Sequence, residues 1–172
     1  MRKIMMLGIA TFLGAADLST AIESPDAKAI LLKDALPAAK VHTMPAGCLT
    51  DNAASIARGN YIFHNLNGKD AKENPPEGLT RLLPNGKEKQ MGNCVACHNI
   101  EGAKGYGNIG PDLTNYKALY MDSGARTGQF LYQQIADPRK DNPNTHMTVN
   151  LANGLFSESE VCDLMSYIVS KK

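Results

Sequence analysis

The sequence feature that most constrains this chain is a C-x-x-C-H pentapeptide at residues 94–98. Its two cysteines, Cys94 and Cys97, can each add to one of the two vinyl groups of a single porphyrin. His98 follows directly, and an imidazole at that position falls beneath the iron and can bind it. The motif therefore predicts one covalently attached haem c, with Cys94 and Cys97 as attachment residues and His98 as the first axial ligand.

Two other uses of paired cysteines fit the sequence less well. A structural zinc site takes four ligands, and no second Cys or His pair stands at ligand spacing. A thioredoxin-like redox pair lies near a βαβ pattern, which is lacking around residues 94–98. Haem attachment is therefore the preferred interpretation.

The first 21 residues have the features of a secretory signal peptide. Arg2 and Lys3 precede an uncharged run over residues 4–16, which is too short to span a bilayer, and small residues follow up to Ala21. Haem is joined to C-x-x-C-H motifs on the outer side of the bacterial cytoplasmic membrane, so the leader and the motif both predict a periplasmic protein. We expect cleavage after Ala21 and no membrane attachment afterwards.

Length and charge limit what the rest of the chain can do. The 172 residues are enough for one domain with a core. Without the leader, sixteen basic residues face sixteen acidic ones, so no basic excess favours nucleic acid. Residues 22–47 contain three prolines around one apolar cluster and predict an N-terminal extension before a domain over residues 48–172. Two roles for it stay open, a strap over the protein's own core and a docking segment for a partner.

Helical signals recur through residues 48–172, and no strand pattern is convincing. The segment 53–63 follows capping residues that include Asn52 and has apolar residues at helical spacing. A second helix is expected over residues 127–136, because Pro138 disfavours its continuation. The predicted fold class is all-α, in a single domain.

The last helix and the longest loop can also be placed. Ser157 and Glu160 have the spacing of a capping box, and an apolar face follows almost to the end of the chain. Residues 64–90 are polar and broken by prolines and glycines, so they predict a long loop with turns.

The second axial ligand of the predicted haem decides between electron transfer and the binding of a small ligand. The downstream candidates are Met121, His146, Met147 and Met165. Met165 belongs to a helix face and Met121 lies among tyrosines, so both are expected to pack. Met147 lies in a loop rich in proline and asparagine and is the predicted ligand. A thioether favours ferrous iron, which suits electron acceptance.

Three segments around the C-x-x-C-H motif resemble the class I cytochromes c. Residues 59–63 resemble the G-x-x-x-F of that family's first helix, and residues 163–167 resemble its closing helix. Residues 109–113 are similar to its G-P-x-L turn. The resemblance implies a class I cytochrome c-like single domain, in which the two helices cross in contact. It also implies that the carbonyl of Pro111 accepts the proton on the non-ligating nitrogen of His98 and so orients the imidazole.

A longer run resembles the SoxX family, which supplies the monohaem subunit of the SoxAX cytochromes of bacterial thiosulfate oxidation. Residues 137–147 have the pattern D-P-R-x-x-N-P-N-T-x-M, and residues 92–98 and 107–111 match as well. The pattern departs at Thr148, where the family commonly has proline, and the match is poorer over residues 64–90.

The SoxX resemblance implies a non-catalytic, electron-transfer subunit of L-cysteine S-thiosulfotransferase, which conjugates thiosulfate to a cysteine of the carrier SoxYZ. Its partners would be a SoxA-type cytochrome with the active haem, SoxYZ and a small soluble electron acceptor. One alternative is a free-standing, diffusible class I cytochrome c. Another is a gas-binding or peroxidatic haem protein with an open sixth position.

Two further sets of residues have more than one interpretation. Cys48 and Cys162 are the two cysteines left after haem attachment, and a pair of cysteines in an oxidising compartment favours a disulfide. Cys48 lies just before the first helix and Cys162 lies on the last, and these helices touch in the class I family, so the geometry permits the bond. A free buried thiol and a bond to a partner subunit stay open. Arg139 could pair with a haem propionate, because a guanidinium fork suits a carboxylate, or form a surface salt bridge.

Overall fold

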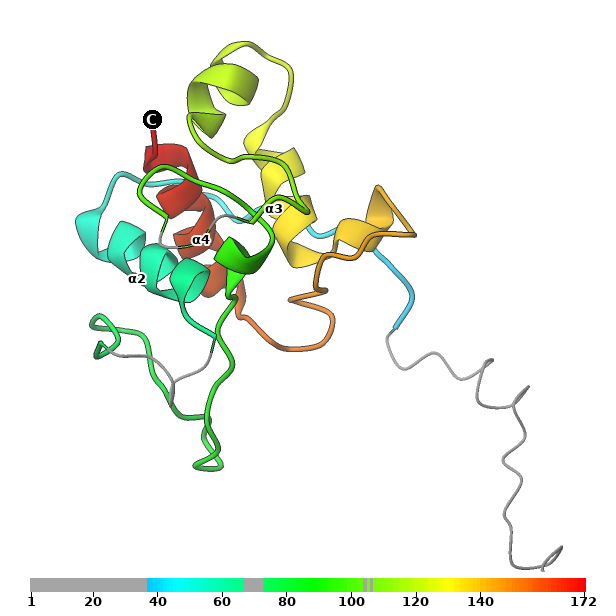
Figure 1. Ribbon diagram of the computed structural model, residues 1–172. Helices are drawn as coiled ribbons and strands as arrows, with labels where there is room; N and C mark the ends of the chain where they lie inside the picture. The colour runs from blue at the N-terminus through cyan, green and yellow to red at the C-terminus, as the bar shows by residue number, and fades with distance from the viewer. Residues whose placement is uncertain (1–36, 67–72, 104, 106) are drawn as a thin grey trace, which may run out of the picture. The chain divides into compact units, whose positions relative to one another are not determined.

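The computed structural model describes residues 37–66, 73–103, 105 and 107–172. In these ranges it contains the α-helices α2 (Ala53–His64), α3 (Gly128–Ala136) and α4 (Glu158–Ser170), the 3-10 helices η2 (Cys94–Ala96) and η4 (Pro138–Lys140), and the π-helix η3 (Lys117–Asp122) (Figure 1). No strand forms in the same ranges beyond one isolated bridge. The all-α prediction is confirmed. The expected signal peptide and residues 22–36 of the expected extension lie outside the described residues.

The helices begin where their capping residues predict. The side chain of Asn52 accepts hydrogen bonds from the backbone N–H of Ala54 (2.9 Å) and Ser55 (3.2 Å) at the start of α2. At the start of α4, Ser157 and Glu160 form both hydrogen bonds of the expected capping box. The predicted bounds of α2 and α3 agree with the structure to within one residue.

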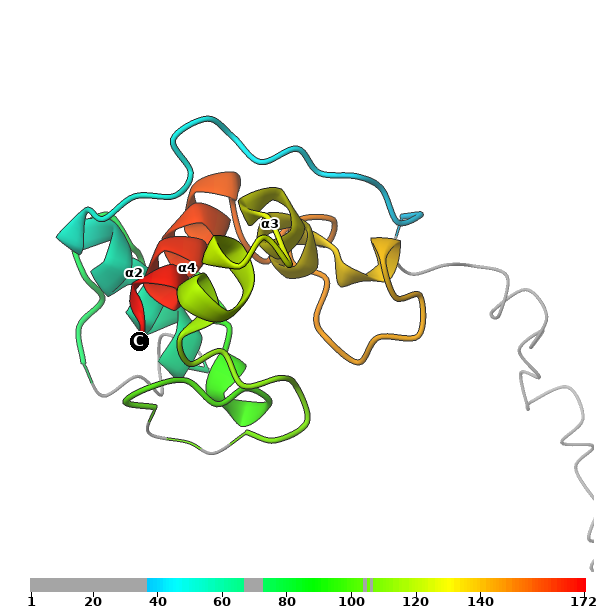
Figure 2. The same ribbon diagram turned by 90° about the horizontal axis from the view of Figure 1, so that it is seen from above.

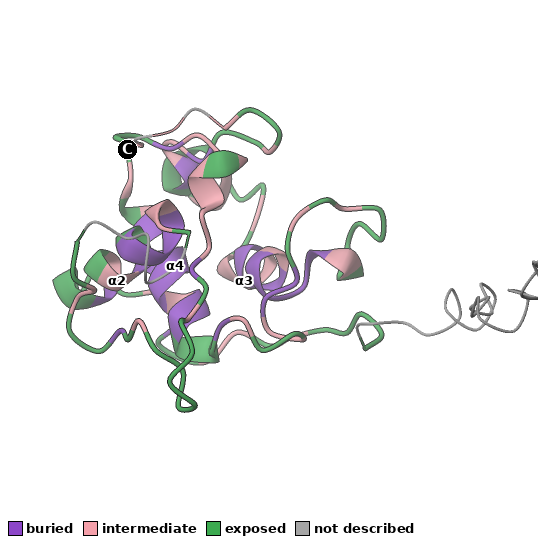
Figure 3. Cartoon of the chain, turned by 60° about the horizontal axis from the view of Figure 1, so that its bottom comes forward, coloured by how far each residue is buried: buried purple, intermediate pink, exposed green. Residues whose placement is uncertain are grey.

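The first and last helices of the domain, α2 and α4, cross in close contact (Figure 1). Gly59 of α2 permits this approach, since a Cβ there would lie 2.6 Å from the carbonyl carbon of Asp163 and 2.7 Å from the Cβ of Tyr167. The rings of Phe63 and Tyr167 pack beside it at 5.5 Å between centroids. α4 is buried over most of its length (Figure 3). This crossing is therefore the centre of the core.

Replacing Gly59 with alanine is expected to destabilise the protein by about 1–3 kcal/mol, because the new methyl group collides with backbone that cannot rotate away. Helix propensity alone predicts the opposite sign, a gain of about 1 kcal/mol. Denaturant unfolding of the haem-loaded protein measures the difference. Asn60→Ala on the exposed side of the same helix is the matched control and should change stability by less than about 0.5 kcal/mol. A more stable Gly59→Ala variant would contradict the close crossing.

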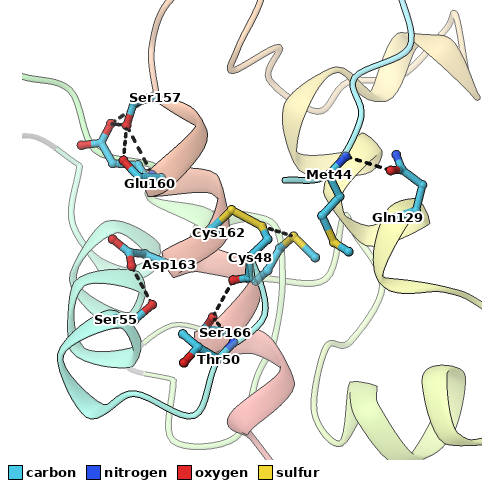
Figure 4. The surroundings of a disulfide bond; sticks show 12 residues. Met44, Cys48, Thr50, Ser55, Gln129, Ser157, Glu160, Cys162, Asp163 and Ser166 are labelled. Atoms are coloured by element: carbon cyan, nitrogen blue, oxygen red, sulfur yellow. Dashed lines mark hydrogen bonds between the residues drawn. A yellow bond between two sulfur atoms is a disulfide. The ribbon is translucent and has the colours of Figure 1, made fainter. Parts of the chain in front are cut away.

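A disulfide joins the segment before α2 to α4 (Figure 4). It links Cys48 to Cys162, which are 114 positions apart in the sequence. The Sδ of Met165 lies 3.7 Å from the Sγ of Cys48, which is a packing contact because a disulfide sulfur carries no hydrogen. The hydroxyl of Ser166 donates to the carbonyl of Cys48 (3.3 Å) and accepts from the N–H of Thr50 (3.2 Å). The covalent link is therefore embedded in the core.

Residues 37–50, which we call the strap, run beside α3 towards the start of α2 (Figure 2). Two glutamines on successive turns of α3 hold it. The side-chain amide of Gln129 accepts from the N–H of Met44 and donates to the carbonyl of His42, both at 2.8 Å. Gln133 accepts from the N–H of His42, also at 2.8 Å. The two side-chain amides thus form hydrogen bonds with the backbone of the strap, as the backbone of a neighbouring β-strand would. The described part of the expected extension thus lies against the protein's own domain.

The described end of the long loop, residues 73–90, contains two tight turns, and the second joins two short antiparallel segments. The N–H of Leu83 donates to the carbonyl of Lys87 (2.7 Å), and the N–H of Lys89 donates to the carbonyl of Arg81 (2.8 Å). The ammonium group of Lys89 also pairs with Glu160 of α4. The expected loop with turns is therefore attached to the last helix.

Candidate haem-binding site

The C-x-x-C-H motif forms one tight turn around η2. The carbonyl oxygen of Cys94 accepts hydrogen bonds from the backbone N–H of Cys97 (3.1 Å) and of His98 (2.8 Å). Asn93 precedes the turn in the left-handed conformation, with φ at 44°, which asparagine adopts more readily than most residues. Neither Cys94 nor Cys97 forms a disulfide. Both sulfur atoms are thus left for attachment to a porphyrin.

The imidazole of His98 is oriented by a backbone carbonyl. Its Nδ1 lies 2.9 Å from the carbonyl oxygen of Pro111. A carbonyl oxygen can only accept a hydrogen bond, so Nδ1 must carry the hydrogen. The lone pair then lies on Nε2, which is the atom left to bind a metal. The structure places His98 and Pro111 as the resemblance to class I cytochromes c implies.

Glycines press closely against the motif. A Cβ on Gly110 would lie 2.6 Å from Nδ1 of His98. A Cβ on Gly107 would lie 2.5 Å from the backbone nitrogen of His98. A Cβ on Gly92 would lie 2.7 Å from the sulfur of Cys94. Only glycine fits at these positions without a shift of the motif. The sequence analysis missed this steric role, although the pattern of glycines on both sides of the motif was its signal.

The environment of Cys94 argues against the zinc interpretation. Burial raises the pKa of its thiol to about 12, and the neighbouring Cys97 adds to the rise. A charged thiolate is therefore disfavoured at this position before any group is attached. In the described ranges, no group of three or more His, Cys, Asp or Glu side chains could hold a metal ion. A thioether to a porphyrin carries no charge and suits this partly buried position.

The loop that carries Met147 is held at both ends by the C-terminal end of α3 and by η4. Before Met147, the carbonyl of Pro138 accepts from the N–H of Asn142 (3.0 Å). After it, the carbonyl of Ala136 accepts from the N–H of Asn150, also at 3.0 Å. The predicted ligand therefore lies on a closed loop whose two ends have fixed positions.

Burial distinguishes Met165 and His146 from the other two candidates for the second axial position. Met165 is fully buried beside the disulfide, and His146 is exposed. Met147 and Met121 are both partly buried and pack against the core. Met147 stays the predicted ligand, and Met121 is the closest alternative by environment.

Arg139 pairs with a buried carboxylate at the start of the same loop. Its Nε lies 2.9 Å from Oδ1 of Asp137 and its Nη2 lies 2.8 Å from Oδ2, a two-point contact. The side chain of Asp137 is fully buried, and Arg139 holds the pKa of that carboxyl below its usual range. The contact stabilises the turn before the Met147 loop. A bond from Arg139 to a haem propionate stays a prediction.

These residues fit a covalently bound haem. Two thiols outside any disulfide flank a turn, the adjacent imidazole presents Nε2, and glycines keep side chains away from the imidazole. When bound, the haem supplies an iron that changes between the ferric and ferrous states one electron at a time. The fold and the site together define a carrier of covalently attached haem.

Comparison with known proteins identifies the family. Residues 83–172, more than half of the chain, match the family model described as Cytochrome c, and the chain therefore belongs to the cytochrome c family. Over 85 residues the chain is 29% identical to cytochrome c-554(548) of Halomonas halodenitrificans. The aligned residues make up 49% of this chain and 92% of that protein. The predicted class I fold, covalent haem c and electron-transfer function are confirmed.

Proposed function

We propose that this cytochrome is the electron-transfer subunit of a SoxAX-type L-cysteine S-thiosulfotransferase in the bacterial periplasm. The observation that carries the proposal is the run at residues 137–147, which resembles the SoxX family. The run is one structural unit, because it begins at the buried Asp137–Arg139 pair and continues into the closed loop that carries Met147. The match to the cytochrome c family does not by itself give a partner or a substrate.

The reaction proposed for the complex needs an electron carrier. An S–S bond forms between thiosulfate and a cysteine of SoxYZ, the thiol proton is released, and two electrons leave. A SoxA-type cytochrome with the active haem would take these electrons and pass them to this chain, one at a time. This chain would then reduce a small soluble electron acceptor.

Location in the periplasm is part of the proposal. It is supported by the leader pattern over residues 1–21 and by attachment of haem to C-x-x-C-H on the outer side of the bacterial membrane. Among the described residues, every helix is too short or too polar to cross a membrane.

A free-standing, diffusible carrier is the second candidate. It is favoured by the match to cytochrome c-554(548), because the alignment spans nearly the whole of that cytochrome. The two candidates differ in whether a larger haem protein is needed for reduction by thiosulfate.

The test is a reconstitution with purified proteins. The tagged holoprotein is isolated from cells grown on thiosulfate, and any co-purifying haem protein is identified by mass and by haem staining. We expect the α-band of ferrous haem to appear when thiosulfate, the SoxYZ carrier and the larger cytochrome are all present, and not when the larger cytochrome is omitted. Reduction that is equally fast without the larger cytochrome, or no reduction in the full mixture, would contradict the proposal.

A further inference from the structure

Two short segments on either side of the His98–Pro111 hydrogen bond run next to each other. They are residues 97–99 and 110–113. Two backbone hydrogen bonds of 2.8 Å join them, from Gly110 to Cys97 and from Leu113 to Asn99. The contact between Nδ1 of His98 and the carbonyl of Pro111 lies between these two bonds in the sequence.

Asp112 connects the two segments with its side chain. Its Oδ2 accepts a hydrogen bond from the side-chain amide of Asn99 (2.7 Å), and its Oδ1 accepts from the backbone N–H of Thr114, also at 2.7 Å. The side chain and backbone of Thr114, together with Asn99, hold the pKa of the Asp112 carboxyl below its usual range. Asp112 is therefore a carboxylate with both oxygen atoms engaged.

The position of the Pro111 carbonyl depends on such neighbours. Pro111 has no N–H to donate, and it is exposed. Asn99 is the residue after His98, and Asp112 is the residue after Pro111. A bond between these two side chains therefore fixes the donor of the His98–Pro111 hydrogen bond relative to its acceptor.

We propose that Asn99 and Asp112 are positioning residues for His98, and that their contact lowers the reduction potential of this cytochrome. A well-placed carbonyl at Nδ1 makes the imidazole a stronger electron donor through Nε2. A stronger donor stabilises ferric iron more than ferrous iron. The contact thus lowers the potential, whichever partner supplies the electrons.

The experiment measures the potential of the holoprotein and of three variants, Asn99→Ala, Asp112→Ala and the two combined. We expect each single variant to raise the equilibrium constant for reduction about threefold, the effect of one ordinary hydrogen bond, or about 28 mV for one electron. The combined variant should equal the single ones, because both break the same contact. The Nδ1 proton of His98 should also exchange faster with solvent by NMR.

A swap separates positioning from charge. Asn99→Asp combined with Asp112→Asn exchanges the amide and the carboxylate at constant net charge, and it should return the potential towards that of the parent protein. Asp122→Asn removes the same charge from the exposed pair with Lys117 and should leave the potential unchanged. A shift in Asp112→Ala without one in Asn99→Ala, additive shifts in the combined variant, or no shift at all would overturn the proposal. None of these outcomes depends on SoxAX, so the proposed function is tested separately.

Discussion

Replacing Met147 with alanine is expected to abolish the sulfur-to-iron charge-transfer band of the ferric protein and to lower its reduction potential. The size should be on the order of 0.1 V, because the choice of axial ligand spans about 0.8 V among haem proteins and a thioether favours ferrous iron. Visible and near-infrared spectra and redox titration measure both changes. Carbon monoxide should bind to the ferrous variant and not to the ferrous parent protein.

Met121→Ala is the control for this substitution, because Met121 is also partly buried and packs against the same core. It should keep the band and lose only some stability. If the band persisted in Met147→Ala and disappeared in Met121→Ala, the second ligand would be Met121. Binding of carbon monoxide to the unmodified ferrous protein would instead favour a gas-binding haem.

Removing the disulfide is expected to give the largest loss of stability. The bond closes a loop across 114 positions of the sequence, and the chain-entropy model assigns about 4.7 kcal/mol to a loop of roughly 100 residues. We expect the Cys48→Ala and Cys162→Ala double variant to lose about 4 kcal/mol in the free energy of unfolding. Denaturant unfolding of the holoprotein measures this difference.

A thiol reductant supplies the control. It leaves the haem thioethers of Cys94 and Cys97 intact and reduces the disulfide between Cys48 and Cys162. The reduced parent protein should unfold close to the double variant, and mass analysis without reductant should find the two cysteines linked. Two alkylatable thiols in the untreated protein, or a double variant as stable as the parent, would show that the pair does not form in solution.

The helices were predictable because their signals are local. Asn52 and the Ser157–Glu160 capping box lie within one helical turn of the groups they bind. The haem site was predictable for a similar reason, since Cys94 to His98 form a single turn. The π-helix η3 was not expected, because no capping residue or break marks it in the sequence.

The partners of the strap and the burial of Asp137 were not revealed by the sequence. Gln129 and Gln133 read as ordinary polar residues of a helix, and only the folded chain shows the strap that they bind. Arg139 had two possible partners in the sequence analysis. The structure pairs it with Asp137, whose burial comes from packing around the end of α3 and cannot be read from the neighbouring residues.

The crossing of α2 and α4 also bears on how the family can diversify. Because these helices are the first and last of the domain, all residues between them form one large loop that is closed at its base. Doubling the length of a flexible loop costs only about 0.6 kcal/mol in closure entropy. A longer or shorter chain between α2 and the haem motif should therefore cost little stability and leave the crossing of the two helices unchanged.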